Sequence, residues 1–510
     1  MPKPNILMIM TDQQRRDTLG AYGCDWIPTP NLDRLASEGV VFENCTVDNP
    51  ICTPSRASIF TGKPVPDHGV LRVHDNLPPD ERLFPERLRD QAGYHTALFG
   101  KLHVSSRVQE QESRHPHDGF DIYEWCLDPT VALDSPFNGY AAWLEETAPD
   151  FLTALRQNGR GELHHAEAVH SSKWAADRTI AFIESAKADT RPFFCLMSLF
   201  DPHDPYADHP WAFRGRIDPA RIPEPIPPHN DHPLAARDRI DPTRIPGPIP
   251  PRNDQPECVK REQEGSYLGR FGDFSTSEIG EIRLGYGASI AFLDEQVGRV
   301  LAALEASGLA RNTLVIFVSD HGDQLGDHGL FVKGVGLYEP TVGVPLLLRW
   351  PGHVSAGTRC TALAQGRDVA ATCLAAAGLD TAASPLSEDL VAMARRNRAD
   401  RTAAICAYRN SGISSAGSFW DPPMRSTMAR TERFKLTVYA SGGKNERELF
   451  DLERDPGETR NISGDPAHAG IELTLLAEIA AFLDREAAIA PPRATSSIPN
   501  ATQRLKNAIK

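Results

Sequence analysis

The segment NPICTPSRASIFTGK, residues 49–63, places a cysteine just before a proline-containing turn and an arginine four residues later. If Cys52 lies at the start of a helix, the helix end and the Arg56 guanidinium both favour its thiolate. This pattern indicates a reactive cysteine. The alternative is a small core residue, because the chain has nine cysteines and free cysteines are often buried. The peptide alone leaves both interpretations open.

Four short apolar runs elsewhere each end in polar residues that could do chemistry. They are NILMIM before Asp12-Gln13, YHTALFG before Lys101 and His103, PFFCLMSLF before His203, and TLVIFVS before Asp320-His321. Such runs, separated by amphipathic stretches such as TPNLDRLASEG, are typical of buried parallel strands that alternate with helices. We therefore expect an α/β fold with a large doubly wound, mostly parallel sheet flanked by helices. Ligands of such sheets collect at the carboxyl ends of the strands.

Two of these strand ends favour a metal site. Asp12, Gln13, Asp320 and His321 offer oxygen ligands and one imidazole, which suits a divalent cation such as Ca²⁺, Mg²⁺ or Mn²⁺ better than zinc. Each aspartate alone could be a turn former or a helix cap. The lysine and the histidines after the other runs could each belong to an ordinary surface loop. The coincidence of all four clusters favours a functional site.

The same residues carry a family resemblance. Cys52-Thr53-Pro54-Ser55-Arg56 resembles the Cys-x-Pro-x-Arg signature of the sulfatases, and GYHT with GKLH, residues 93–96 and 100–103, is similar to their second signature. Asp12, the Asp320-His321 pair, Lys333 and the ending ELFDLERDPGETRNIS, residues 448–463, follow in the family's order. The resemblance thus spans nearly the whole chain.

This resemblance implies a covalent modification. In sulfatases the cysteine of the signature is oxidised to formylglycine (3-oxoalanine), so Cys52 would be modified by a formylglycine-generating enzyme during maturation. The hydrated aldehyde then attacks a small anionic ester beside one divalent metal ion, which acts as a Lewis acid. The resemblance implies as metal ligands Asp12, Gln13, Asp320, His321 and the modified Cys52.

The remaining roles are also implied by the resemblance. Arg56 would orient the modified residue. Lys101 and Lys333 would hold the substrate oxygens, where charge builds up during transfer. His203 would protonate the leaving oxygen, and His103 would accept the proton whose loss releases the product.

Some positions depart from the common sulfatase pattern. Many sulfatases carry a second aspartate at the position of Gln13 and an asparagine at the position of His321. Both residues here, and Asn76 as a substrate-binding residue, are similar to the phosphonate monoester hydrolases. Lys101 and His103 match the sulfatases proper instead. We expect an arylsulfatase-like hydrolase that also accepts phosphonate monoesters and phosphodiesters. The alternatives are a phosphonate monoester hydrolase or phosphodiesterase, and a catalytically silent sulfatase-like binding protein.

Composition limits the other function classes. With 510 residues, 40% of them hydrophobic, the chain can form one large core and a second domain. A net charge of −14 disfavours nucleic-acid binding. The cysteines show neither a paired framework nor a CxxC motif, and no signal peptide or membrane-spanning stretch is evident. We expect a cytoplasmic homo-oligomer, a dimer or tetramer, that does not bind membranes.

We expect two domains: residues 1–385 as the catalytic domain and residues 386–510 as a smaller α+β unit with an antiparallel sheet, a final helix and a tail that clasps a neighbouring subunit. The insertion at 214–256 contains RIDPARIPEPIPPHND, residues 216–231, which recurs as RIDPTRIPGPIPPRND, residues 239–254. Its prolines predict extended surface loops. They could wall the active-site entrance, but a neutral duplication is the favoured interpretation.

Overall fold

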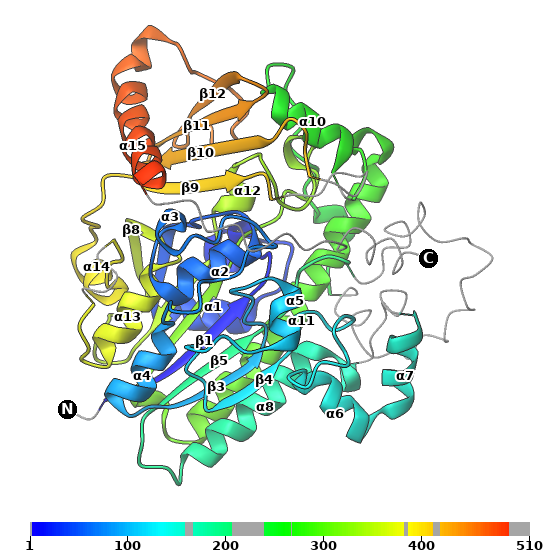
Figure 1. Cartoon of the computed structure of the whole chain (residues 1–510), viewed down its shortest axis with the longest axis vertical. Helices are drawn as coiled ribbons and strands as arrows, with labels where there is room; N and C mark the ends of the chain where they lie inside the picture. The colour runs from blue at the N-terminus through cyan, green and yellow to red at the C-terminus, as the bar shows by residue number, and fades with distance from the viewer. Residues whose placement is uncertain are drawn as a thin grey trace.

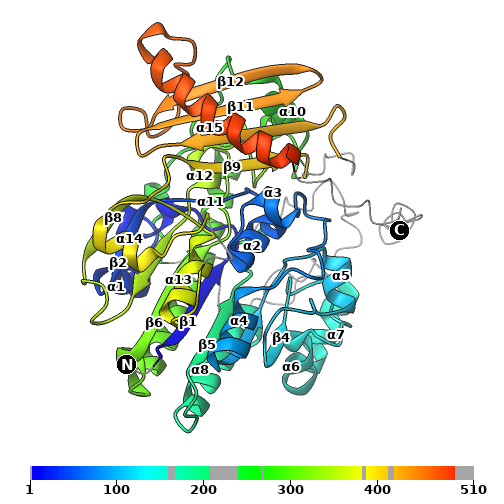
Figure 2. The same cartoon turned by 60° about the vertical axis from the view of Figure 1, so that its left-hand side comes forward.

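The structure is a computed structural model that describes residues 3–158, 167–206, 239–266, 268–381, 386–411 and 419–488. A large sheet with helices on both faces forms the body of the molecule, and a smaller sheet with the last helix lies at one end (Figures 1 and 2). The predicted fold class is confirmed. The first copy of the proline-rich repeat and the C-terminal tail lie outside the described residues.

The large sheet has eight strands in the order β4-β3-β5-β1-β6-β7-β2-β8. Four adjacent strands, β3, β5, β1 and β6, are the four predicted apolar runs, and all of them are parallel. Only β7 runs antiparallel to its neighbours. The strands are β1 (Asn5–Thr11), β2 (Val40–Thr46), β3 (His95–Gly100), β4 (Ile122–Trp125), β5 (Phe193–Ser198), β6 (Thr313–Ser319), β7 (Leu346–Arg349) and β8 (Thr358–Gln365).

Helices cover both faces because the strands are apolar on both sides. In β1, Ile6, Met8 and Met10 belong to one buried cluster, and Leu7 and Ile9 belong to the other. The first cluster includes residues of α2 (Cys52–Thr61), α4 (Phe84–Ala92), α13 (Asp368–Ala376) and α14 (Leu390–Arg396). The second includes residues of α1 (Pro30–Ser37), α6 (Gly139–Thr147), α7 (Pro149–Asn158), α8 (Ser171–Ala186) and α11 (Thr276–Ala306). Further helices are α3 (Val65–His68), α5 (Arg107–Glu112), α10 (Glu257–Gly265) and α12 (Glu339–Val342).

The second sheet is antiparallel, in the order β12-β11-β10-β9. Its strands are β9 (Ala404–Arg409), β10 (Met424–Arg430), β11 (Phe434–Ser441) and β12 (Lys444–Asp451), and α15 (Ala469–Ala488) packs on it. Leu475 and Ile479 of α15 share a buried cluster with Leu436 and Leu449. The sheet begins at Ala404, and α14, which precedes it, packs on β8 and α13. The domain boundary at 385 stays a prediction.

One stretch of the described residues, Pro466–Ala488, is long and apolar enough to cross a membrane. Length and composition alone are weak evidence. One side of this helix packs on the small sheet, where Leu475 is fully buried.

The second copy of the repeat, residues 239–254, is extended between a 3-10 turn at Pro242–Arg244 and a turn at its end, and most of it is exposed. This confirms the prediction for that copy. Ile249 pairs with the loop after β6: its N–H donates to Asp327 Oδ1 (2.7 Å), and its carbonyl accepts from His328 N (2.7 Å). All nine cysteines are free thiols, so the chain has no disulfide framework, as predicted.

Candidate active site

The register of the central strands places the polar residues side by side. Thr11 lies opposite Ser319, so Asp12 and Asp320 leave the sheet as neighbours. Gly100 lies opposite Ser198, and Lys101 N then donates to Ser198 O (3.2 Å). Gly100 has a φ of +114°, and a Cβ there would lie 1.9 Å from Ser198 O, so only glycine fits before Lys101. The predicted meeting of strand ends therefore occurs.

Cys52 is the first residue of α2 and is 4% exposed. The preceding Ile51 N–H donates to Asn49 Oδ1 (2.8 Å), which fixes the entry into the helix. Burial by itself would raise the pKa of the Cys52 thiol, but Lys101, the neighbouring His321 and Lys333 together hold that pKa below its ordinary value. The thiol is thus buried, as expected of a core residue, and it also lies in an electropositive environment, as expected of a reactive cysteine.

Asp12, Asp320 and His321 form a group with the chemistry of a metal site. All three are fully buried, and one ligand atom from each lies within 4.8 Å of the others. His321 Nδ1 lies 2.9 Å from the Gly322 carbonyl, which only accepts, so Nε2 presents its lone pair to the carboxylates. Nε2 and Asp12 Oδ1 have no hydrogen-bond partner. Buried polar atoms without partners are rare, so this donor set fits a divalent cation.

The other oxygen of each carboxylate is held by cationic side chains. Arg56 Nε lies 2.6 Å from Asp320 Oδ2, and its Nη2 lies 3.3 Å from Asp12 Oδ2. Lys101 Nζ lies 2.6 Å from Asp12 Oδ2. Burial opposes ionisation of Asp12, but Lys101, His203 and Arg56 hold the pKa of its carboxyl well below the usual range. Asp12 Oδ1 is thereby left without a partner, and Asp320 Oδ1 accepts only from the Gln13 backbone N–H, so both can contact a cation.

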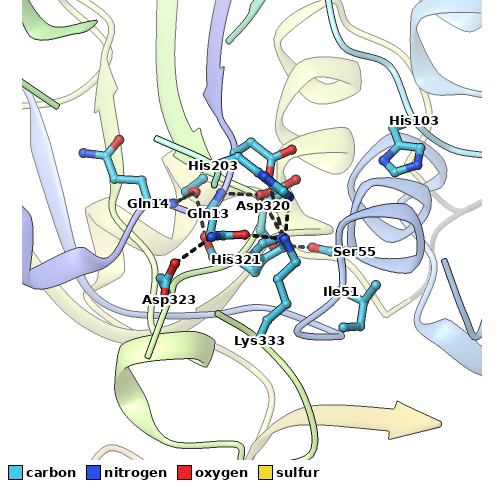
Figure 3. Close-up of polar contacts among 12 residues, drawn as sticks. Gln13, Gln14, Ile51, Ser55, His103, His203, Asp320, His321, Asp323 and Lys333 are labelled. Atoms are coloured by element: carbon cyan, nitrogen blue, oxygen red, sulfur yellow. Dashed lines mark hydrogen bonds and ion pairs between the residues drawn. The ribbon is translucent and has the colours of Figure 1, made fainter. Parts of the chain in front are cut away.

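Gln13, Lys333 and His203 form a second group beside the carboxylates (Figure 3). Gln13 N donates to Asp320 Oδ1 (3.0 Å), but its side-chain Oε1 accepts from Lys333 Nζ. Lys333 Nζ also lies 2.6 Å from His203 Nε2. Burial and the Lys333 charge lower the pKa of His203 to about 4. The structure therefore brings Gln13 to the predicted metal site and turns its amide oxygen toward Lys333.

His103 contacts Thr53, the residue after Cys52. Its Nε2 is 3.0 Å from Thr53 Oγ1, whose hydrogen goes to the Val73 carbonyl (3.2 Å), so Nε2 donates and Nδ1 keeps a lone pair. Nδ1 is buried and has no hydrogen-bond partner. Burial, Lys101 and Arg56 hold the pKa of His103 well below its ordinary value. A neutral imidazole with a free lone pair suits a proton acceptor.

Asn76 is the predicted site residue that the structure does not bring into these groups. Its side chain is exposed, and its Oδ1 accepts from Ser106 N (3.1 Å). It thus supports the loop that follows His103.

Four site residues were not assigned a role from the sequence: Asp204, Tyr206, Tyr286 and Asp323. Asp204 and Asp323 lie in the polar segments DPHD and DHGD that follow predicted strands, so their position was a usable signal. The two tyrosines carry no such signal. Tyr286 lies in the middle of α11 and reaches the site only through the fold.

Comparisons with known proteins agree with this geometry. The model of the sulfatase family matches residues 4–379, and a model described as N-sulphoglucosamine sulphohydrolase, C-terminal, matches residues 326–484. An arylsulfatase of Clostridium perfringens is 28% identical over 486 residues, 90% of each chain. An N-acetylglucosamine-6-O-sulfatase of Bacteroides thetaiotaomicron is 27% identical over 92% of this chain and 84% of that protein. The solved phosphonate monoester hydrolase of Agrobacterium radiobacter superposes with a TM-score of 0.71 at 23% identity, over 95% of this chain and 96% of that one.

Proposed function

Because this chain is a hydrolase of the sulfatase family, we propose that it hydrolyses sulfate monoesters at residue 52, with one divalent cation bound beside it. The observation that carries the proposal is the Lys101–Asp12 pair, 2.6 Å apart, next to the buried Cys52. A sulfate monoester carries one negative charge. Lys101, Lys333 and a bound cation offer it local positive charge within an acidic protein.

Sulfatases generally use formylglycine and a divalent metal. In this proposal, Cys52 is converted to formylglycine, which supplies the oxygen nucleophile. A cation held by Asp12, Asp320 and His321 supplies Lewis acidity toward that nucleophile and the substrate. The unpartnered Asp12 Oδ1 and His321 Nε2 support this assignment. The ligand set, oxygen-rich with one imidazole, suits Ca²⁺, Mn²⁺ or Mg²⁺.

Side chains of this protein bind the substrate and transfer the protons. Lys101 and Lys333 bind the sulfate oxygens, where negative charge accumulates in the transition state. In this proposal His203 gives the hydrogen of its ring to the leaving oxygen, and Lys333, whose Nζ lies 2.6 Å from His203 Nε2, returns a proton to the ring. His103 Nδ1 keeps a lone pair that can accept the proton whose loss releases the product.

Hydrolysis of phosphonate monoesters and phosphodiesters is the second candidate. These esters also carry one negative charge, and the imidazole of His321 stands where many sulfatases have an asparagine. The fold likeness to a phosphonate monoester hydrolase is compatible with this activity.

Parallel kinetics separate the two candidates. One preparation is assayed on nitrophenyl sulfate, a phenylphosphonate monoester, a phosphate diester and a phosphate monoester. We expect the highest kcat/KM for the sulfate and the lowest for the phosphate monoester, whose second charge needs more cations. A leading phosphonate or diester reaction would favour the second candidate.

The modification is tested separately by mass spectrometry of the tryptic peptide that contains residue 52, which should show the conversion of CH₂SH to an aldehyde. Cys52→Ala should abolish turnover and leave the fold intact. Full activity with an intact thiol, or in this variant, would contradict the proposed nucleophile.

A further inference from the structure

Two buried glutamates bind the backbone of the two loops that carry His103 and Lys333, residues 101–106 and 330–338. We propose that Glu110 and Glu262 are positioning residues: Glu110 fixes the loop of His103, and Glu262 fixes the loop of Lys333. The inference rests on the proposed function, in which both side chains take part in the reaction. Figure 3 shows these two side chains on separate segments of the chain.

Glu110 lies in the first turn of α5, and its carboxylate binds the segment that precedes this helix. Its Oε2 accepts from His103 N (3.0 Å), and its Oε1 accepts from Val104 N (2.7 Å) and Ser105 N (3.1 Å). Three consecutive N–H groups thus converge on one carboxylate, as in the backbone concavities that bind anions. Oε2 also accepts from Trp125 Nε1 (2.9 Å), which attaches the loop to the end of β4.

The backbone of His103 needs such support. Its φ is +58°, in the left-handed region that residues other than glycine seldom adopt, and such conformations persist where surrounding contacts hold them. The N–H of this same residue donates to Glu110. Lys101, in the same loop, is held separately, because its N donates to Ser198 O and its Nζ pairs with Asp12. Glu110 therefore acts on His103 rather than on Lys101.

Glu262, on α10, binds the loop of Lys333 in a similar way. Its Oε2 accepts from Val335 N (2.9 Å), and the carboxylate also accepts from the backbone N–H of Gly336. A Cβ on Gly334 would lie 1.7 Å from Glu262 Oε1, so only glycine lets the carboxylate lie against this backbone. The peptides that directly follow Lys333 are thus bound to α10.

α10 also holds the turn before this loop. Gln263 Nε2 donates to the His328 carbonyl (2.7 Å). The helix is itself attached to the small sheet, where Arg261 Nη1 donates to Ser441 Oγ (2.8 Å) at the end of β11. Lys333 therefore lies between two points that are bound to the same helix.

Both carboxylates are buried, and peptide N–H groups replace water around them. Glu110 is 2% exposed and Glu262 is 6% exposed, and neither forms an ion pair with the residues that the structure describes. Burial raises the pKa of each carboxyl to about 7, and the hydrogen bonds from the loops oppose this rise. Alanine at either position would leave buried N–H groups without an acceptor, so the loop would have to move.

Steady-state kinetics on nitrophenyl sulfate test the pairing. A misplacement of about 1 Å can cost on the order of 100-fold in rate. Lys333 acts while sulfate is transferred, so Glu262→Ala should lower kcat/KM by roughly 10- to 100-fold. His103 acts when the product is released, so Glu110→Ala should lower kcat by a similar factor and leave kcat/KM nearly unchanged. A loss of kcat/KM in Glu110→Ala as large as in Glu262→Ala would overturn the inference.

Double mutants show whether each glutamate acts through its own side chain. In the Lys333→Ala background, Glu262→Ala should cause no further loss of kcat/KM, and in the His103→Ala background, Glu110→Ala should cause no further loss of kcat. Glu110→Gln and Glu262→Gln keep the side-chain volume and one acceptor oxygen. They should recover part of each loss, and they cover the case in which an alanine variant does not fold. A full loss in the matched background would contradict the assignment.

A second measurement does not depend on hydrolysis. Backbone hydrogen exchange is followed by mass spectrometry of the peptides that cover residues 103–105 and 335–336. We expect it to rise several-fold at 103–105 in the Glu110 variants and at 335–336 in the Glu262 variants. Each variant is the matched control for the other, since exchange at the other loop should stay as in the wild type.

Unchanged exchange at the loop that a glutamate binds would overturn its role. If the wild-type protein hydrolyses no sulfate ester, the proposed function fails, and the exchange rates still decide whether Glu110 and Glu262 fix the two loops.

Discussion

Lys101 and Asp12 form an ion pair, Nζ to Oδ2 2.6 Å, with side chains that are 3% and 0% exposed. Burial disfavours the charged form of Lys101, but Asp12 and Cys52 raise the pKa of its ammonium above the ordinary value. The lysine is therefore a fixed positive charge at residue 52, and its position is set by the carboxylate.

The first prediction concerns this lysine. Lys101→Ala should lower kcat/KM for an aryl sulfate by about 100-fold or more, because it removes a cation from the transferred oxygens and leaves Asp12 with fewer partners. Kinetics on the four nitrophenyl esters give the measurement. Lys173→Ala is the control. Lys173 pairs with Asp177 on the surface of α8, so its loss should leave kcat/KM unchanged. If Lys101→Ala spares sulfate turnover, the sulfatase assignment gives way to the phosphonate hydrolase.

The second prediction concerns metal removal. Asp12 and Asp320 are both buried, and a chelator should leave their Oδ1 atoms without the cation proposed for them. We expect EDTA to lower the melting temperature by several degrees, since a ligand that binds only the folded state stabilises it. His321→Ala should bind less metal, by elemental analysis, and its melting temperature should respond less to EDTA. An equal response in both proteins would contradict the assigned ligands.

The third prediction concerns acid stability. Burial and the nearby Lys63 charge lower the pKa of His68 to about 3 from an ordinary 6.5. Val70 N donates to His68 Nδ1 (3.1 Å), and the ring's Nε2 lies 2.8 Å from Ser58 Oγ, so the native ring is neutral. Its contribution to stability is complete above pH 6.5 and is lost as the pH falls toward 3, with a slope of about 1.4 kcal/mol per pH unit.

His68→Gln should reduce this slope, because glutamine does not take up a proton. Urea unfolding of both proteins at several pH values between 4 and 7 measures the difference. If the unfolding free energies of the two proteins fall equally as the pH is lowered, another group causes the loss of stability in acid.

The fourth prediction concerns the proline-rich repeat. Arg252 of the second copy contacts Glu448 and donates to the Glu458 carbonyl (2.7 Å), and its guanidinium lies over the Phe450 ring. The first copy has His229 at this position. Arg252→His should destabilise the protein by about 3 kcal/mol, because it weakens the pairing of a fully buried carboxylate.

Arg244→Ala is the control within the same segment. Arg244 pairs with Asp25 at an exposed site, so its loss should change the unfolding free energy by less than about 1 kcal/mol. Chemical denaturation measures both variants. Similar losses in the two would contradict a special role for Arg252.

The strands that form the centre of the sheet were predictable because they are apolar on both faces. The order of the outer strands was not, since β7 is a four-residue antiparallel strand inserted between β6 and β2. No local pattern distinguishes such a strand from a parallel one.

The site was predictable where a residue directly follows a strand. Asp12, Lys101 and Asp320 all do, and the register brings them together. The direction of a side chain was not predictable. The Gln13 amide nitrogen lies 2.6 Å from Asp323 Oδ2 and 3.4 Å from the Tyr206 hydroxyl oxygen, and these residues are 310 and 193 positions away in the chain.

Arg56 donates to groups at the ends of four strands: Asp12 after β1, the Lys101 carbonyl after β3, Ser198 at the end of β5, and Asp320 after β6. One guanidinium therefore couples the positions of these four strand ends to the position of α2, the helix that carries Arg56 and begins at Cys52.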